Sequence, residues 1–145
     1  MLVIKYGGTS VGSAERFRTA ADIIKGIKDH DLVVVVSAMS GTTNALIAGA
    51  RAAAAGGVEQ YQTLKAQLAS RHLAAASDLL VSGDELVAIS AYVEQRLADF
   101  EGLCHAISLL GELTMRGHDA VASIGEEISS RILAAFLRQG GRQAQ

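Results

Sequence analysis

The chain has 145 residues, half of them apolar and 19% charged, which suits one folded domain and excludes a disordered segment. The formal net charge is −2, so no overall basic charge predicts binding to nucleic acid or to an anionic membrane. The single cysteine, Cys104, excludes an internal disulfide. The sequence shows no signal peptide and no apolar run near the ~20 residues of a membrane helix, so we expect a cytoplasmic protein.

The N-terminal residues predict a strand, a helix and a second strand. Residues 2–6 are a short apolar run that ends in two glycines, which is typical of a buried strand followed by a turn. Ser13 is a candidate N-cap for the helix that follows. Residues 32–36 are consecutive apolar residues, mostly valine, which indicates a parallel strand buried on both faces. We therefore expect parallel strands at about 2–6 and 32–37, adjacent in one sheet.

The rest of the chain predicts helices. A short helix is expected over residues 44–55, ended by two glycines. Residues 58–116 show no strand pattern, and apolar side chains repeating every seven positions predict a long helical hairpin with its turn near residues 82–83. A last helix is expected from about residue 119 to residue 139, and residues 142–145 are the candidate start of a further strand.

The first candidate site is the segment Lys-Tyr-Gly-Gly-Thr-Ser at residues 5–10, directly after the first strand. Glycines lack Cβ atoms, so Gly7 and Gly8 let backbone N–H groups approach an anion, and Lys5 adds a positive charge for a transferring phosphoryl group. The spacing matches neither the P-loop nor the dinucleotide-binding pattern. A tight turn beside a solvated lysine explains the segment equally well, and spacing alone leaves both interpretations open.

The second candidate site is Ser-Ala-Met-Ser-Gly-Thr-Thr-Asn at residues 37–44, which follows the second strand. Open parallel sheets bind ligands beyond the carboxyl ends of their strands, so this loop and residues 5–10 would form one floor. The alternative is a polar loop in which Thr43 caps a helix.

The third candidate site is Ser-Ile-Gly-Glu at residues 123–126, near the expected start of the last helix. A glycine inside a helix costs about 1 kcal/mol relative to alanine, and close approach of another segment or a ligand would justify Gly125. Glu126 and Glu127 project about 100° apart on a helix, so at most one of them faces a site. Alternatively, both are surface charges that the helix dipole favours.

In this order, the three segments resemble blocks of the aspartate kinases, which belong to the amino-acid kinases. The resemblance covers essentially the whole chain. It implies an α/β fold, namely the N-terminal portion of the three-layer αβα amino-acid-kinase fold with parallel strands, here with a long helical hairpin insertion. Related kinases that act on acetylglutamate, glutamate or uridylate share the opening strand with its lysine and two glycines. They are not expected to carry the second and third segments in this form.

The resemblance implies ATP-dependent phosphorylation of the aspartate side-chain carboxylate to 4-phospho-L-aspartate, at the head of lysine, threonine and methionine biosynthesis. Mg²⁺ bridging the β- and γ-phosphate oxygens is the expected metal, with no protein ligand implied for it. By the same resemblance, the ATP phosphates would contact Lys5, Tyr6, Gly7, Gly8 and Ser10, with Lys5 as the catalytic residue. The aspartate would be surrounded by Ser37, Ala38 and Thr43, and its ammonium would be accepted by Glu126.

The family pattern continues with an Arg-Gly-Gly-Ser-Asp-like segment, purine-binding elements and ACT regulatory domains, none of which occurs in residues 1–145. We therefore expect an incomplete catalytic domain that is inactive alone, binds its ligands weakly or not at all, and self-associates through apolar surface. Two alternatives stay open. One is another amino-acid kinase of the same fold, acting on acetylglutamate or glutamate. The other is a non-catalytic helical interaction module built on residues 58–116.

Overall fold

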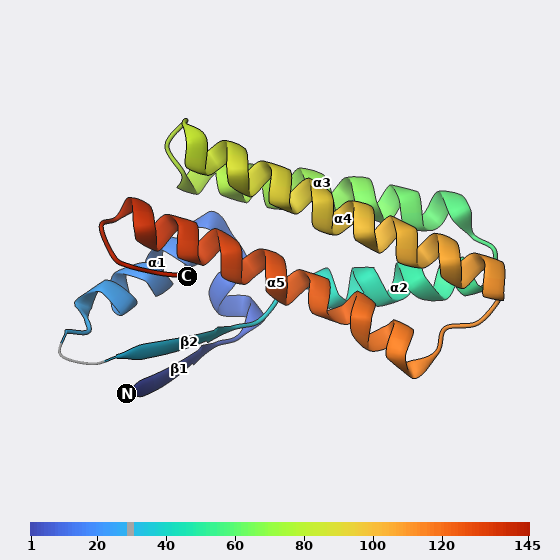
Figure 1. Ribbon diagram of the computed structural model, residues 1–145, viewed down its shortest axis with the longest axis horizontal. Helices are drawn as coiled ribbons and strands as arrows, with labels where there is room; N and C mark the ends of the chain where they lie inside the picture. Colours follow the sequence, from blue (N-terminus) through green and yellow to red (C-terminus); the bar gives the residue numbers. More distant parts are fainter. Residues whose placement is uncertain (29–30) are drawn as a thin grey trace.

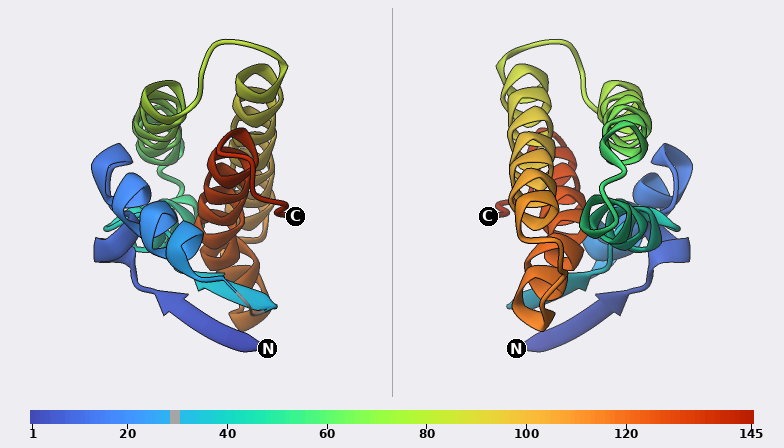
Figure 2. Two further views of the ribbon diagram at one scale, coloured as in Figure 1. Left: turned by 90° about the vertical axis from the view of Figure 1, so that its left-hand side faces the viewer. Right: turned by 90° about the vertical axis from the view of Figure 1, so that its right-hand side faces the viewer.

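The computed structural model describes residues 1–28 and 31–145 and arranges them in three tiers. A two-stranded sheet lies at one side, three helices pack above it, and a pair of long helices lies furthest from the strands (Figures 1 and 2). In chain order the elements are β1 (Leu2–Tyr6), the 3-10 turn η1 (Gly8–Val11), α1 (Ala14–Gly26), β2 (Leu32–Val36), α2 (Thr42–Ala54), α3 (Val58–Leu79), α4 (Asp84–Leu110) and α5 (Met115–Gln139).

The two strands are parallel and adjacent, as the sequence predicts. Their register runs from Leu2 opposite Leu32 to Tyr6 opposite Val36. Helix α1 connects them, and the Ser13 hydroxyl accepts a hydrogen bond from the backbone N–H of Arg16 at 3.4 Å, which confirms the predicted N-cap. The carboxyl ends of both strands therefore meet at one edge of the sheet, where the first two candidate segments begin.

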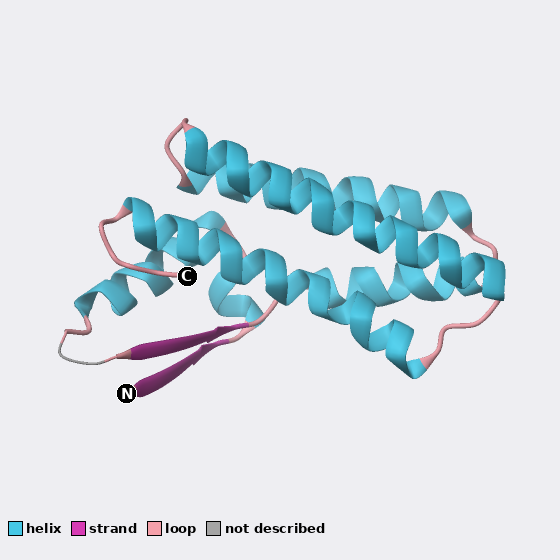
Figure 3. Cartoon of the chain, viewed as in Figure 1, coloured by secondary structure: helices cyan, strands magenta, loops and turns pink. Residues whose placement is uncertain are grey.

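Only one face of the sheet is covered. Tyr6 and Val36 point toward the helices and are buried, whereas Val3, Val33 and Val35 on the other face are 57%, 46% and 46% exposed. Figure 3 shows the strands at the outside of the molecule. The expectation that the second strand is buried on both faces is therefore wrong for this chain, because the helices that the structure describes pack against one face of the sheet.

Helices α3 and α4 lie side by side and are joined by residues 80–83, where the turn was predicted (Figures 1 and 2). The seven-residue repeat on α4 accounts for the packing, since Val93, Phe100 and Ile107 are all buried. An ion pair between Lys65 of α3 and Glu101 of α4 also links the two helices.

Two helices begin earlier than the sequence pattern indicates. Helix α2 begins at Thr42 because Gly41 adopts a left-handed conformation, with φ of 79°, and serves as its N-cap. Helix α5 begins at Met115 because the Thr114 hydroxyl accepts a hydrogen bond from a first-turn N–H group at 3.1 Å. Glu126 therefore lies well inside α5, and the interpretation that it sits near the helix start, where the dipole would favour it, is wrong.

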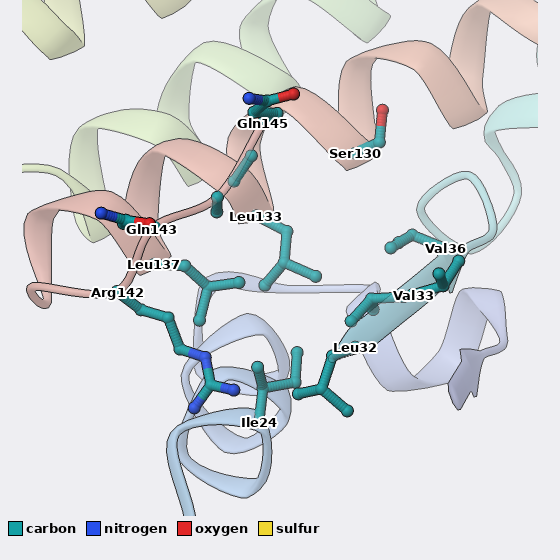
Figure 4. Close-up of a pocket in the computed structure, with 13 residues that line it drawn as sticks. Ile24, Leu32, Val33, Val36, Ser130, Leu133, Leu137, Arg142, Gln143 and Gln145 are labelled. Carbon is teal, nitrogen blue, oxygen red and sulfur yellow. The ribbon is translucent and has the colours of Figure 1, made fainter. Parts of the chain in front are cut away.

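The C-terminal residues 142–145 do not form the strand that was considered for them. The Arg142 side chain donates to the Ile27 carbonyl at 2.8 Å, which holds this segment against the end of α1. A hollow of about 370 Å³ lies between this segment, β2, α1 and α5. Its aliphatic side chains converge in Figure 4, where they include Ile24, Leu32, Leu133 and Leu137. No candidate site residue lines this hollow.

Among residues 1–28 and 31–145, every helix is too short or too polar to span a membrane.

Candidate functional site

A second hollow, of about 260 Å³, lies where the loops after β1 and β2 meet the start of α2 and the middle of α5. It brings together the three candidate segments, which are far apart in the sequence. The residues that line it are Gly8, Ser37, Ala38, Met39, Ser40, Gly41, Thr43, Asn44 and Glu126. We call this hollow the candidate site.

The loops after the two strands touch each other directly. The Ser37 N–H donates to the Tyr6 carbonyl at 3.0 Å, which extends the sheet pairing by one step, and the Ser40 hydroxyl donates to the Gly8 carbonyl at 3.0 Å. A Cβ atom at Gly8 would lie 2.8 Å from the Ala38 carbonyl oxygen, closer than real Cβ atoms approach. Glycine at this position is therefore required by the contact between the loops, in addition to any ligand.

The loop after β2 also packs tightly against α5. A Cβ atom at Gly125 would lie 2.6 Å from the Cβ of Ala38 and 3.0 Å from a methyl group of Thr42. The close approach of another segment is one of the two reasons that the sequence suggests for a glycine inside this helix. Because Gly125 lets the helix approach the loop, the next residue, Glu126, reaches the candidate site.

The adjacent carboxylates Glu126 and Glu127 have different surroundings. The Glu127 carboxylate accepts from Arg96 at 3.4 Å and from the Ser123 hydroxyl at 3.2 Å. Glu126 lines the candidate site, and its Oε2 atom is buried and accepts no hydrogen bond from any residue that the structure describes. A buried carboxylate oxygen without a donor is costly, so this site favours a ligand that brings N–H groups or positive charge.

The first turn of α2 also lines the candidate site. Its N-cap is Gly41, which has no side chain to accept from the first-turn N–H groups, while Thr43 and Asn44 line the hollow. A helix N-terminus with free N–H groups attracts anions. A carboxylate on one wall and N–H donors on another make the hollow suited to a ligand that carries both an ammonium and a carboxylate.

The remaining candidate residues lie outside this hollow. Lys5 is exposed on the open face of the sheet, in register with Val35. The Tyr6 side chain is buried on the covered face, where its hydroxyl donates to the Ala20 carbonyl at 3.4 Å and burial raises its pKa. The Tyr6 side chain is therefore not placed to contact a phosphate at the candidate site.

Gly7 and Ser10 are close in sequence to the hollow without lining it. No atom that the structure describes lies within 4 Å of where a Gly7 Cβ would be, which leaves space for a ligand to approach its backbone. Ser10 lines a smaller hollow of about 100 Å³ that also includes Tyr6. The structure thus groups Gly8, Ser37, Ala38, Thr43 and Glu126 around one hollow, whereas Lys5, Tyr6, Gly7 and Ser10 do not line it.

Arg71 on α3 was missed by the sequence analysis. Its guanidinium donates to the Ser40 carbonyl at 2.5 Å and to the Gly12 carbonyl at 3.1 Å, so it contacts both loops of the site. Its partners are 31 and 59 residues away in the sequence, and no motif surrounds it. No signal in a single sequence marks this arginine.

Comparisons with known proteins agree with the resemblance that the three segments carry. The model of the amino acid kinase family matches residues 1–145. Over 145 residues the chain is 34% identical to "Aspartokinase 3, chloroplastic" of Arabidopsis thaliana, covering 99% of this chain and 25% of that relative. Over 54 residues it is 57% identical to "Aspartate kinase" of Pseudomonas fluorescens, covering 36% of this chain and 13% of that relative.

Solved structures show the same fold. The crystal structure of E. coli aspartokinase III in complex with aspartate and ADP (R-state) matches with a TM-score of 0.83 and 28% identity, covering 99% of this chain and 30% of that one. The same enzyme in complex with lysine and aspartate (T-state) matches with a TM-score of 0.75 and 26% identity, covering 97% of this chain and 29% of that one.

This chain spans about a quarter of the length of the curated aspartokinases that it matches over nearly its whole length. The expected α/β fold and the resemblance to aspartate kinases are both confirmed by these matches. From the match over all 145 residues, the chain belongs to the amino acid kinase family.

Proposed function

We propose that this chain carries the aspartate-binding part of an aspartate kinase, which transfers the γ-phosphoryl group of ATP to the side-chain carboxylate of aspartate. The product, 4-phospho-L-aspartate, would serve lysine, threonine and methionine biosynthesis in the cytoplasm. In this proposal the nucleotide-binding half and the ACT regulatory domains lie outside residues 1–145, and the chain alone is inactive. Supporting the proposal, E. coli aspartokinase III, which shares the fold, has been crystallised with aspartate and ADP.

The observation that carries the proposal is the carboxylate of Glu126, whose buried Oε2 accepts no hydrogen bond from any described residue and which lines the same hollow as the start of α2. An amino-acid ligand satisfies both walls at once. Its ammonium would pair with Glu126, and a carboxylate would accept from the first-turn N–H groups near Thr43. The Ser37 side chain and the Ala38 backbone, which line the same hollow, would complete the enclosure of the aspartate.

Phosphoryl transfer requires positioning and neutralisation of charge more than covalent chemistry by the protein. Lys5 and the open backbone at Gly7 lie at the carboxyl end of β1, beside the candidate site, and in this proposal they contact the phosphates of ATP. The backbones of Tyr6 and Gly8 and the side chain of Ser10 would add to that contact.

Mg²⁺ would arrive with ATP, held mainly by phosphate oxygens and water, and would neutralise the phosphate charge. Within residues 1–28 and 31–145 no three His, Cys, Asp or Glu side chains are grouped to hold a metal ion. The site residues of this chain therefore fit a nucleotide-borne Mg²⁺ without supplying a cage for it, and we assign none of them as a ligand.

In this proposal the same geometry favours aspartate over the substrates of related kinases. The nitrogen of acetylglutamate is acylated and uncharged, so that ligand would leave the Glu126 carboxylate without an ionic partner. Glutamate keeps the ammonium but adds one methylene, which a preformed hollow discriminates by only about 1–3 kcal/mol. Acetylglutamate is therefore the sharper comparison.

Nuclear magnetic resonance titration of the chain tests this proposal. We expect aspartate at millimolar concentration to shift the amide signals of Ser37, Thr43 and Glu126, and acetylglutamate to shift them far less. Glu126→Gln should abolish the aspartate response. Glu127→Gln is the matched control, because it removes the same charge one position away and should leave the response intact. Binding of acetylglutamate that equals binding of aspartate would reject the assignment.

A further inference from the structure

Arg71 bonds to the backbone immediately before two helices. Its Nη1 donates to the carbonyl of Ser40, which precedes Gly41, the N-cap of α2. Its Nη2 donates to the carbonyl of Gly12, which precedes Ser13, the N-cap of α1. One side chain of α3 thus bonds to the backbone at the starts of α1 and α2, the two helices that follow the loops of the site.

We infer that Arg71 is a positioning residue that fixes the loops after β1 and β2 relative to each other and thereby sets the affinity of the candidate site for its amino-acid ligand. The statement about affinity rests on the proposed function, whereas the statement about the loops does not. The hollow itself is lined by other residues, so Arg71 acts through the loops and not by touching the ligand.

The geometry favours this role over a nonspecific surface contact. A guanidinium is planar, permanently charged and carries its donors in a rigid fork, so it can bond two carbonyl groups in a fixed relation. The loops have a further direct link between side chain and backbone, from the Ser40 hydroxyl to the Gly8 carbonyl. Arg71 adds two charge-assisted bonds to that link and ties both loops to α3.

The base of the arginine is itself held in place. His72, the next residue on α3, is fully buried, and its Nδ1 bonds to the Leu68 carbonyl at 2.7 Å. The helix therefore cannot roll without moving a buried side chain. The burial of His72 therefore holds the part of α3 from which the Arg71 side chain extends to the loops.

The consequence for the ligand follows from Ser40. Its carbonyl belongs to the peptide unit that leads into Gly41, so holding that carbonyl orients the first turn of α2. That turn, which includes Thr43, lines the same hollow as Glu126. Without the hydrogen bond to the Ser40 carbonyl, the first turn of α2 would be free to move. Its N–H groups would then move relative to the Glu126 carboxylate, and both are groups that bind the ligand.

Hydrogen–deuterium exchange measured by mass spectrometry tests the positioning role without any ligand. Arg71→Met keeps the aliphatic stem and removes the donors. We expect exchange to accelerate about tenfold or more in peptides covering residues 7–13 and 37–45, where the N–H groups of Ser10 and Thr42 are bonded within the loops, and not in α4.

The matched control is Arg18→Met. Arg18 also donates to a backbone carbonyl at the interface of α1 and α3, that of Asp78, but it lies away from the candidate site. It should leave exchange in both loops unchanged. Arg71→Lys should be intermediate, because an ammonium lacks the fork that reaches two carbonyl groups. Unchanged loop exchange in Arg71→Met, or acceleration spread over the whole chain, would overturn the positioning role.

Titration with aspartate then separates the two claims. We expect Arg71→Met to weaken aspartate binding about tenfold, with Arg71→Lys between it and the unmodified chain. Loops that loosen in Arg71→Met while the unmodified chain binds no aspartate would support the positioning role and reject aspartate binding by this chain alone, which is the part of the proposed function that the titration tests. Loops that loosen without any loss of affinity would overturn the claim that Arg71 sets affinity.

Discussion

Replacing Gly125 by alanine tests the contact that brings α5 to the candidate site. By helix propensity alone, Gly125→Ala should stabilise the chain by about 1 kcal/mol, because alanine is the better helix former. The added Cβ, however, would lie 2.6 Å from the Ala38 Cβ and 3.0 Å from a Thr42 methyl group. Carbon atoms pack best at about 3.5–4.0 Å, so helix and loop would have to separate by about 1 Å.

The clash should outweigh the gain in propensity. Overpacking of this kind costs typically about 1–3 kcal/mol. The nearest atom in conflict, the Ala38 Cβ, is bonded directly to the backbone, so rotation of a side chain cannot relieve that contact. We expect a net loss of about 1–2 kcal/mol in the free energy of unfolding, measured by urea denaturation. The matched control is Gly102→Ala in α4, where no described atom lies within 4 Å of the new Cβ. That variant should gain up to about 1 kcal/mol.

A second substitution separates the clash from other effects. Combining Gly125→Ala with Ala38→Gly moves the methyl group from one side of the contact to the other and removes the 2.6 Å conflict. The double variant should recover part of the lost stability, giving a favourable coupling energy in the double-mutant cycle. Gly125→Ala that is as stable as the unmodified chain would show that the helix and loop are not in this contact.

The burial of Cys104 and His72 and the exposure of the sheet valines lead to three further predictions. Burial raises the pKa of Cys104 to about 12, so it should resist thiol reagents at pH 8 until the chain unfolds, and rapid labelling of the native chain would contradict its placement. Burial lowers the pKa of His72, so the unfolded state binds more protons below about pH 6.5, and stability should fall as the pH drops from 7 to 5. His72→Gln should flatten that slope in urea titrations at several pH values, and an unchanged slope would assign it to other groups. The apolar open face of the sheet should drive self-association at high micromolar concentration. In sedimentation measurements, the double substitution Val33→Lys and Val35→Lys should reduce this association. An unmodified chain that sediments as a monomer would refute this prediction.

Local patterns predicted most of the elements. The strands at residues 2–6 and 32–36, the Ser13 cap and the turn between α3 and α4 follow from apolar periodicity and turn residues. The start of α5 was misplaced because residues 115–118 carry little apolar periodicity. The cap that begins the helix, Thr114, is a single polar residue without the glutamate that would complete a capping box.

Burial of the sheet could not be predicted from the valine run. The composition of residues 32–36 matches a strand covered on both faces, yet the helices that the structure describes cover one face. The composition of a strand indicates the environment in which that strand is most stable. The exposure of its side chains in a given chain depends on which other segments are present to cover them. The open valines are therefore consistent with the proposal that further parts of the domain belong on that face.

The candidate site was partly accessible from the sequence. The resemblance to the aspartate kinases implied that Ser37, Thr43 and Glu126 surround one ligand, and the structure places them, with Gly8, around one hollow. That Lys5 faces the open side depends on which face of the sheet the helices cover, which a short strand does not reveal. The contacts of Arg71 depend on how α3 packs on the loops, and that requires coordinates.

The most direct test of the central claim is a phosphoryl-transfer assay. The chain would replace the matching segment of E. coli aspartokinase III, whose structure it matches with a TM-score of 0.83, and ADP binding would first establish that the hybrid is folded. We predict that the hybrid forms an acyl phosphate from ATP and aspartate in preference to glutamate and acetylglutamate, and that Glu126→Gln removes this activity while Glu127→Gln retains it. A folded hybrid that phosphorylates acetylglutamate or glutamate better than aspartate, or that is indifferent to Glu126→Gln, would contradict the account.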